Sequence, residues 1–163
     1  MSAMRPMKSG DWQQFVKRYR SYLNELARFD GDVDTTAEPT KDWVNLPVLL
    51  FPYVSQSRGV DCGFFLITGR AYAKAMGEDC DAFLHALFTD PKARGTGATE
   101  EAILAAFARH PGTWGLHVLD TNEPALRFWR RILKLHVPDF VESELSPNLL
   151  RFRFEIPKTQ LAL

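Results

Sequence analysis

The spacing of apolar residues predicts a short extended segment near residues 2–7 and then a long amphipathic helix. The helix is expected from Asp11 to about Phe29, because its apolar residues recur three or four positions apart and form one stripe. Asp11 and Gln14 form a capping-box pattern at the start of this helix. The residues of the apolar stripe are Phe15, Tyr19, Tyr22, Leu23 and Leu26.

The pattern changes in the middle of the chain, where branched and aromatic residues form runs that are typical of strands. Strands are predicted at residues 46–56 and 61–69, with a hairpin turn between them. A third strand is predicted at residues 80–89, because Asp-Pro ends the run and a glycine-rich corner follows. The segment 71–79 fits either a helical turn or an irregular excursion, and its pattern does not decide between them.

A second helix is predicted at residues 98–107, where apolar side chains again share one face. The sequence His-Pro-Gly at 110–112 ends it. Residues 113–120 then predict a strand. A third helix is expected from Asp120 to Leu133, with Asp120 and Glu123 as a second capping box.

Two extended segments, residues 136–143 and 148–156, complete the chain. In the second, apolar and charged residues alternate, as expected of a half-buried strand. The apolar set is Leu150, Phe152, Phe154 and Ile156, and the charged set is Arg151, Arg153 and Glu155. The order of strands and helices indicates a mixed α/β layer structure.

The composition is that of an ordinary globular protein with one domain, residues 1–163. The 20 basic and 20 acidic side chains balance, so no overall field favours nucleic acid or a membrane surface as a partner. Cys62 and Cys80 match no zinc pattern, and we expect free thiols and no metal site. The first residues contain no apolar signal core, and no apolar run reaches the roughly 18 residues of a membrane span. A cytoplasmic protein is expected.

The segment Thr89–Glu101, TDPKARGTGATEE, joins a predicted strand to the start of a helix. Unpaired amides and the helix dipole favour phosphate at such a position. Gly95 and Gly97 leave room for a diphosphate to approach these amides, and Arg94 is placed to neutralise charge or to stack. A simple connecting loop is the alternative. The Gly-Lys-Ser/Thr of a Walker loop and the third glycine of a dinucleotide fingerprint are both missing.

Two motifs in this order resemble the GNAT superfamily of acetyl-CoA-dependent N-acyltransferases. LFTDPKARGTGA is similar to its Arg-X-X-Gly-X-Gly/Ala loop, and HVLDTNEPALRFWRRIL is similar to its Asn-X-X-Ala-X-X-Phe-Tyr helix. Residues 110–131 resemble a bacterial branch of predicted acetyltransferases. The positions that match the two motifs are Arg94, Gly97, Asn122, Ala125 and Phe128.

The resemblance implies an α/β fold with a mixed, mostly antiparallel central sheet of about six to seven strands and about four flanking helices. It also implies acetyl-CoA as cosubstrate, held largely by backbone groups. The residues that it assigns to cofactor binding are Leu87, Phe88, Thr89, Arg94, Gly95, Thr96, Gly97, Ala98, Thr99, Asn122 and Phe128. Thr89 and Thr99 depart from the usual Val and Gly/Ala. Trp129 stands where many members have a Tyr that protonates the thiolate, and an indole is not an acid near neutral pH.

The implied reaction is attack of a neutral amine on the thioester, which needs a proton acceptor and oxyanion donors. The donors are expected from the backbone of Leu87, Phe88 and Thr89. Our hypothesis is that His85, two residues before Leu87 and on the same strand face, is the base or positions a water that acts as the base. A histidine satisfied within the sheet is the alternative. Asp81 is the second candidate for the base, and His117 is interpreted as structural.

The first helix and the acidic loop after it usually form the acceptor pocket in this family, although a solvated loop is the simpler interpretation. The acceptor is expected to be the amine of a small molecule or a peptide. A non-catalytic CoA-binding or regulatory module is the alternative function, because of Trp129. A homodimer is left open, since late strands such as 149–156 could pair across a subunit edge. The pocket candidates are Tyr19, Tyr22, Asp30, Asp32 and Asp34.

Overall fold

In the computed structural model, which describes residues 3–45 and 50–158, seven strands and five α-helices follow one another. The strands are β1 (Met4–Pro6), β2 (Leu50–Ser57), β3 (Val60–Gly69), β4 (Ala82–Thr89), β5 (Gly112–Leu119), β6 (Val141–Ser146) and β7 (Leu149–Ile156). The helices are α1 (Trp12–Leu26), α2 (Asp42–Asn45), α3 (Arg70–Ala75), α4 (Ala98–Arg109) and α5 (Glu123–His136). Part of the strand predicted at 46–56 lies outside the described residues, and α3 resolves the segment 71–79 as mainly helical.

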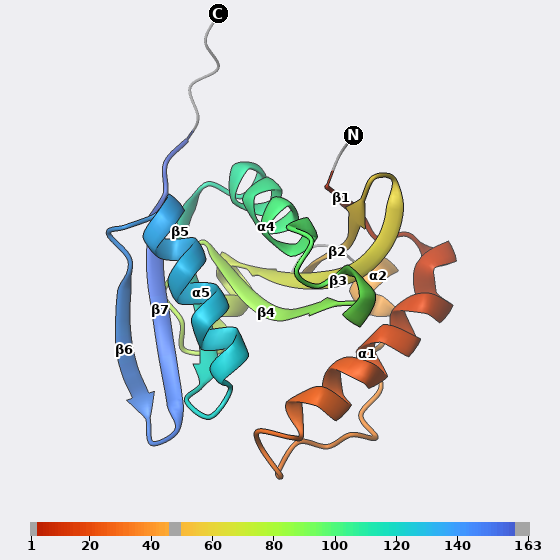
Figure 1. Cartoon of the computed structure of the whole chain (residues 1–163), viewed down its shortest axis with the longest axis horizontal. Coiled ribbons are helices and arrows are strands. Elements are labelled where there is room, and N and C mark those ends of the chain that lie inside the picture. Colours follow the sequence, from red (N-terminus) through yellow and green to blue (C-terminus); the bar gives the residue numbers. More distant parts are fainter. Residues whose placement is uncertain (1–2, 46–49, 159–163) are drawn as a thin grey trace, which may run out of the picture.

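The strands form one sheet in the order β1-β2-β3-β4-β5-β7-β6, and Figure 1 shows that β5, β7 and β6 turn away from β2–β4. All neighbours are antiparallel except β4 and β5. This parallel pair is short, because it ends at the partners Leu84 and Leu116. Beyond these residues the two strands separate, and we call the gap between residues 85–89 of β4 and 117–119 of β5 the wedge.

The predicted hairpin between β2 and β3 is confirmed. Its turn residues Arg58 and Gly59 have φ values of 52° and 78°. Two consecutive left-handed residues make the tight turn whose twist matches that of antiparallel strands. The alternation predicted for β7 is also confirmed at Phe152 and Phe154, which are buried.

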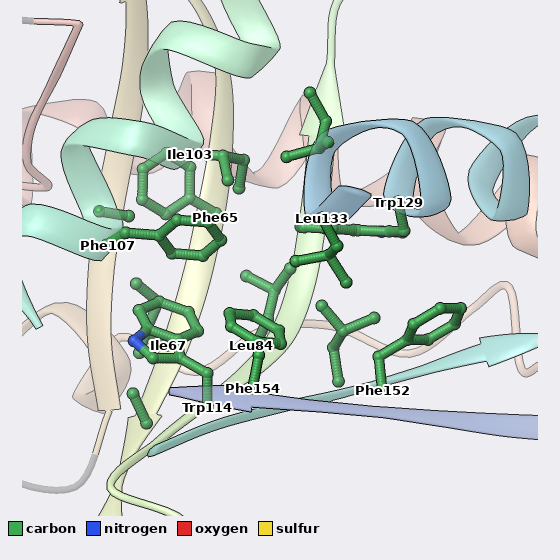
Figure 2. Packing of buried hydrophobic residues seen from close by; sticks show 14 of the residues in the cluster. Phe65, Ile67, Leu84, Ile103, Phe107, Trp114, Trp129, Leu133, Phe152 and Phe154 are labelled. Carbon is green, nitrogen blue, oxygen red and sulfur yellow. The ribbon is translucent and has the colours of Figure 1, made fainter. Parts of the chain in front are cut away.

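Helices α4 and α5 cover one face of the sheet (Figure 1), and the apolar side chains between them form the α4–α5 core (Figure 2). Ile103 of α4 and Leu133 of α5 are fully buried in it. Phe107 packs edge-on against Trp114, with ring centroids 5.0 Å apart. Replacing a side chain as enclosed as Phe152 by Ala typically costs about 3–5 kcal/mol.

Helices α1 and α2 cover the opposite face and form the α1 core with β2, β3 and β4. Phe15, Tyr19 and Leu23 of α1 are its buried members, as the apolar stripe predicts. Phe15 meets Phe64 of β3 edge-on at 5.0 Å. The sheet is therefore a layer between two separate cores, and the wedge opens through that layer.

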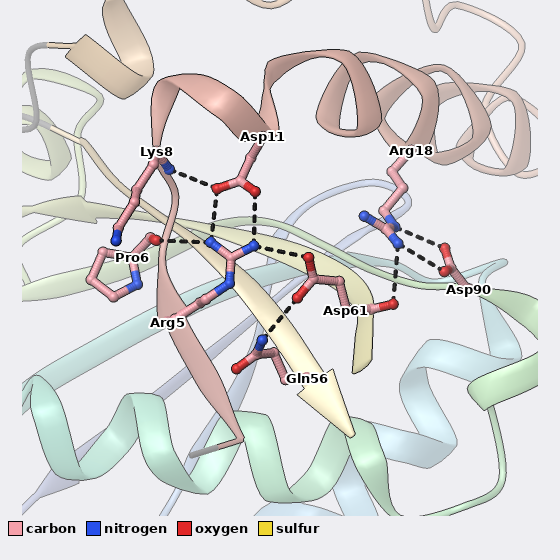
Figure 3. Close-up of polar contacts among 8 residues, drawn as sticks. All are labelled: Arg5, Pro6, Lys8, Asp11, Arg18, Gln56, Asp61 and Asp90. Atoms are coloured by element: carbon pink, nitrogen blue, oxygen red, sulfur yellow. Dashed lines mark hydrogen bonds and ion pairs between the residues drawn. The ribbon is translucent and has the colours of Figure 1, made fainter. Parts of the chain in front are cut away.

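Ion pairs fasten β1 and α1 to the edge of the sheet, as Figure 3 shows. Arg5 donates to both carboxylate oxygens of Asp11 and to Asp61 of β3, each at 2.8 Å. Arg18 of α1 donates to Asp90 at 3.0 and 3.1 Å. We call these five residues the β1–α1 network; most of their side chains are only partly buried.

Both predicted capping boxes are wrong. The carboxylate of Asp11 accepts from Arg5 and from the Lys8 amide, and it makes no capping bond to α1. At α5 the cap is Asn122, whose side-chain oxygen accepts from the Ala125 amide at 3.3 Å. The first helix also ends at Leu26, three residues earlier than predicted.

Strand β7 lies between β5, which pairs with its residues Leu149–Ile156, and β6, which pairs with its residues Leu149–Arg153. The edge strand on this side is β6. Cys62 and Cys80 are unpaired and buried, which confirms the expected free thiols. None of the helices in ranges 3–45 and 50–158 has the length and apolar content that a membrane span requires.

Candidate functional site

A cavity of about 970 Å³ occupies the wedge and extends to the loop of residues 94–97, which we call the glycine loop. Its walls come from α1 and the segment after it, β4, the glycine loop, β5 and α5. This volume lies at the upper end of the range for cofactor and substrate sites, roughly 300–1,000 Å³. Its polar and charged lining residues include Tyr22, Glu25, Arg28, Asp30, His85, Thr89, Arg94, Thr99, Glu100, His117, Asn122 and Arg131.

The glycine loop lines the cavity at the N-terminus of α4. Gly95 and Gly97 have φ values of 76° and 87°, a backbone conformation that residues other than glycine adopt only with strain. Apart from the glycine and its two chain neighbours, no atom of the described residues lies within 4 Å of the place where a Cβ would stand on either residue. The space over the loop is therefore open to a ligand, and a side chain at either position would reduce it.

The main-chain amides at this corner point to an anion site. Among the described residues, none accepts a hydrogen bond from the amides of Gly95, Gly97, Thr99 or Glu100. Amides in the first turn of a helix have no partner within the helix, and its dipole adds partial positive charge there. The arrangement can accept a phosphate or diphosphate group without any special side chain.

Arg94 supports the glycine loop through contacts that the sequence did not predict. Its Nε donates to the Thr89 carbonyl at 2.8 Å, and its Nη2 donates to both carboxylate oxygens of Glu25 on α1, at 2.8 and 2.9 Å. The guanidinium also lies 5.3 Å from the centre of the Phe88 ring. Arg94 is therefore already neutralised by Glu25, and it joins the loop to α1 and to the end of β4.

Two of the predicted cofactor residues lie outside the cavity lining. Ala98 is buried beneath the loop, and the Thr96 hydroxyl bonds within the turn to the Ala93 carbonyl and the Ala98 amide. Both stabilise the loop rather than face the cavity. Thr89 and Thr99 do line it, and their hydroxyls bond to each other at 2.7 Å, which links the end of β4 to the first turn of α4.

His85 is a β-bulge residue in β4. Leu66 of β3 pairs with Ala86, and the next residue, Ile67, pairs with Leu84, so His85 has no partner. Leu84 packs in the α4–α5 core and Ala86 in the α1 core, so the alternation of faces changes at this residue. The simple alternation from which a shared face of His85 and Leu87 was predicted is therefore interrupted at His85.

The bulge nevertheless leaves His85 in the cavity lining. Its ring is accessible from the cavity and makes no hydrogen bond to any residue in the described part of the chain. Burial among the surrounding atoms lowers the pKa of His85 below its ordinary value. The neutral ring, which can accept a proton, is thus favoured near neutral pH.

Asp81 does not belong to the site, which corrects its choice as the second candidate base. It is absent from the cavity lining and lies just before β4. Its carboxylate accepts from the Thr113 amide at 2.9 Å, from the Thr113 hydroxyl at 3.1 Å and from Arg70 at 2.9 Å. These bonds, the backbone amide first, lower the pKa of Asp81 and fasten β4 to β5.

His117 lines the cavity from β5 and is held by a residue that sequence reasoning missed. Its Nε2 lies 2.6 Å from Oε1 of Glu78, whose side chain is only 3% exposed. Arg151 and Arg153 of β7 donate to the same carboxylate at 3.0 and 2.9 Å. We call these four residues the Glu78 cluster. Burial, the largest single influence, opposes ionisation of Glu78, but the bonds from Arg153, His117 and Arg151 together lower its pKa.

The α5 side of the cavity contains the residues that match the second motif. Asn122 caps the helix through its side-chain oxygen, and Phe128 and Trp129 also line the cavity. Trp129 is 5% exposed and packs in the α4–α5 core. Near the glycine loop, a hydrogen bond from His136 and a weaker one from Arg131 lower the pKa of Glu100.

Only part of the predicted acceptor region reaches the cavity. Tyr22 and Asp30 line it, whereas Asp32 and Asp34 do not. Tyr19 is 9% exposed and packs in the α1 core. The loop after α1 is joined to the opposite wall by Thr121, whose hydroxyl donates to the Phe29 carbonyl at 3.2 Å.

No protein-family model matches the chain, and no curated protein matches its sequence. Solved structures match its fold. An acetyltransferase from Thermus thermophilus has a TM-score of 0.65 and 16% identity, over 95% of this chain and 99% of that one. The GNAT domain of S. lividans PAT has a TM-score of 0.62 and 12% identity, over 93% and 89%.

A third match is the PaiA N-acetyltransferase from Thermoplasma acidophilum in complex with coenzyme A, with a TM-score of 0.61 and 9% identity, over 93% of this chain and 97% of that one. The three structures share the fold of this chain, which has a mixed and mostly antiparallel sheet with helices on both faces. The chain has the GNAT fold, as its two motifs predict. The short helices α2 and α3 account for five helices where about four were expected.

Proposed function

We propose that the chain is an acetyl-CoA-dependent N-acetyltransferase that acts on a primary amine of a small molecule or a peptide. One observation carries the proposal: a single cavity joins the unpaired amides of the glycine loop to the wedge between β4 and β5. The first region suits a diphosphate and the second suits an extended chain with a reacting group at its end.

The residues that would hold the cosubstrate are mostly main-chain groups. Gly95, Gly97 and Thr99 offer amides to the diphosphate. The pairing of β4 with β5 ends at Leu84, so residues 85–89 present a strand edge without a partner in the sheet. An extended pantetheine arm would bond to this edge as a peptide adds to a sheet. Asn122 and Phe128 would flank the arm from α5.

The thioester supplies the acetyl group, and the chain's residues supply proton acceptance and oxyanion stabilisation. His85 would accept a proton from the attacking amine, because its low pKa keeps the ring neutral. Of the backbone amides of Leu87, Phe88 and Thr89, those that point away from β3 and into the wedge would stabilise the tetrahedral oxyanion. The indole of Trp129 cannot donate a proton as an acid near neutral pH, so the departing thiolate takes its proton from solvent or from an imidazolium.

A non-catalytic module that binds CoA is the second candidate, and Trp129 at the position of the usual acid is the observation that favours it. We place either activity in the cytoplasm, where the unpaired thiols of Cys62 and Cys80 persist.

A thermal-shift titration with acetyl-CoA tests cosubstrate binding. At 100 times its dissociation constant, a ligand that binds only the folded chain stabilises it by about 2.7 kcal/mol. For a protein of this size this raises Tm by roughly 5–10 °C. Absence of any shift at millimolar acetyl-CoA would contradict both candidate functions.

Release of CoA from acetyl-CoA, measured with spermidine, tyramine, L-lysine and a short peptide with a free N-terminus, separates the two candidates. Turnover with at least one amine supports the transferase. A clear thermal shift without acceleration by any amine supports the binding module.

A further inference from the structure

The carboxylate of Glu78 is buried behind His117, which lines the cavity, and three cationic or titratable side chains bind it. Gly77, with φ of 88°, turns the chain after α3, and the Glu78 amide donates to the Ala73 carbonyl at 2.8 Å. This turn directs Glu78 toward β5 and β7. Burying an ion is costly, and the reward in stability over an apolar alternative is generally small. The cluster therefore calls for a functional explanation.

The register of β5 places His117 on the face of the sheet opposite to the α4–α5 core. Trp114, Leu116 and Val118 pack in the α4–α5 core, so His117, which alternates with them, faces the side covered by α1 and α3. It pairs in register with Arg151 of β7. His117 therefore enters the wedge from the side opposite to α5 and Trp129.

Glu78 also determines which nitrogen of His117 can accept a proton. An ionised carboxylate only accepts hydrogen bonds, so the neutral ring must carry its proton on Nε2, the atom 2.6 Å from Glu78. The lone pair then lies on Nδ1, which has no partner among the described residues. Phe83 packs edge-on against the ring at 4.9 Å and limits its rotation. A carboxylate that orients an imidazole in this way is the usual arrangement of a catalytic base.

We propose that His117 is a catalytic base that takes the first proton from the acceptor ammonium, and that Glu78 is its positioning residue. This inference rests on the proposed function. An ammonium must lose two protons in the reaction, one before it attacks and one from the tetrahedral intermediate. His117 Nδ1 receives the first, and His85, next to the oxyanion donors of β4, receives the second. The C–S bond then breaks, the thiolate takes up one proton, and the other goes to solvent.

The charges around His117 come from several elements. Arg151 and Arg153 of β7 donate hydrogen bonds to Glu78, which contacts His117 directly. His85 faces the same cavity from β4. Glu25, Arg28, Asp30 and Tyr22 line the cavity from α1 and the segment after it. Among the described residues, Glu78 alone forms a hydrogen bond or an ion pair with His117, so we expect the pH profile of the His117 variant to report chiefly on the ring itself.

The test compares His117→Gln with His85→Gln over pH 7 to 9.5, using the best substrate among the panel amines with a pKa near 10, which are spermidine, tyramine and L-lysine. The neutral fraction of an amine with pKa near 10 rises from about 0.1% to about 25% over this range. At pH 7, His117→Gln is expected to lower kcat/KM by about 100-fold. At pH 9.5 the loss nearly disappears, because the neutral fraction of the amine in solution is then large enough that the enzyme no longer has to remove the first proton. His85→Gln keeps its loss at both pH values, because the second proton must still be removed.

A merely structural role for His117 predicts a loss of the same size at every pH, or no loss, and either result overturns the inference. Glu78→Gln should reproduce the pH-dependent loss more weakly, because the amide still accepts from Nε2. Asp61→Asn, a matched change in the β1–α1 network outside the cavity, should keep the wild-type profile. The acetyl-CoA thermal shift of His117→Gln should equal that of the wild type, which shows that the variant folds.

Failure of the proposed function gives a different result. If the wild type itself acylates no amine of the panel, the transferase proposal fails, and the inference fails with it. If the wild type is active and His117→Gln shows the wild-type pH profile, only the inference is overturned.

Discussion

At the glycine loop the groups that favour an anion are main-chain amides, whereas on the β5 side of the wedge the titratable group is a side chain held by other side chains. Gly95 and Gly97 of the loop leave open space on the cavity side, and the amides there have no hydrogen-bond acceptor among the described residues. In the wedge, His117 is held by Glu78, which is in turn held by Arg151 and Arg153. The two ends of one cavity are therefore built by different means.

The difference follows from what each end has to do. A diphosphate carries a fixed charge, and preorganised amides at a helix N-terminus bind it without changing state. An amine must be deprotonated during the reaction, which requires a titratable group in a defined tautomer. Changes at the loop should thus affect affinity, and changes at the wedge should affect the pH dependence of turnover.

The largest effect is expected from Gly97→Val. At φ of 87° a residue other than glycine costs roughly 1–2 kcal/mol, and valine is branched at Cβ. Its side chain would also stand in the open space over the amides. Losing two charge-assisted hydrogen bonds, at about 1.5–3 kcal/mol each, corresponds to roughly 10²–10⁴-fold weaker binding. Calorimetric titration with acetyl-CoA measures the affinity.

Gly31→Val is the matched control, because Gly31 also has open space around it but lies in the exposed loop after α1 without a positive φ. It should bind acetyl-CoA as the wild type does. Binding of wild-type strength by a folded Gly97→Val protein would contradict the role given to the loop amides.

The contrast between the two ends also explains what the sequence revealed. The glycine loop is a local feature, because the strand end, the glycines and the helix start all lie within residues 89–101. They follow one another in the sequence and can be recognised there. Most helices and strands were likewise predicted from local periodicity. The same local reasoning failed at the helix caps, because Arg5, six residues before Asp11, competes for that carboxylate.

The wedge could not be predicted in the same way, because its contacts join distant residues. Glu78 is 39 residues from His117 and 75 from Arg153, and no spacing in the sequence connects them. The bulge at His85 is equally hidden, since the residues on both sides of it, 82–84 and 86–88, are all apolar, so the sequence pattern does not show the change of face. The sequence therefore indicated His117 as structural, and only the fold placed it in the cavity.

The second largest effect is expected from Glu78→Ala, measured as the free energy of unfolding in urea. Removing one partner of a buried ion pair costs about 3–5 kcal/mol, because the remaining charges stay desolvated. Since the pKa of Glu78 is lowered in the folded chain, its stabilising contribution is present above the ordinary glutamate pKa. The contribution is lost as the pH falls through the folded-state value. The difference between variant and wild type should thus shrink from pH 7 to pH 3.

Asp11→Ala in the β1–α1 network is the comparison variant. Its ion pair with Arg5 is more exposed, with side chains that are 19% and 29% accessible, and such pairs contribute about 0–1 kcal/mol. A loss at Asp11 as large as the loss at Glu78 would remove the distinction between a network that fastens the fold and one that serves the cavity.

The smallest effect is expected from Glu25→Gln, which removes the charge that neutralises Arg94. The pair is 33% and 42% exposed, so its loss should change the free energy of unfolding by less than about 1 kcal/mol. Acetyl-CoA affinity should stay within about threefold of the wild type, because the amides rather than the guanidinium bind the diphosphate. Glu123→Gln, in an exposed pair with Arg127 on α5, is the control for a neutralised surface charge. A tenfold change in affinity at Glu25 alone would mean that side chains govern the loop end of the cavity as they govern the wedge.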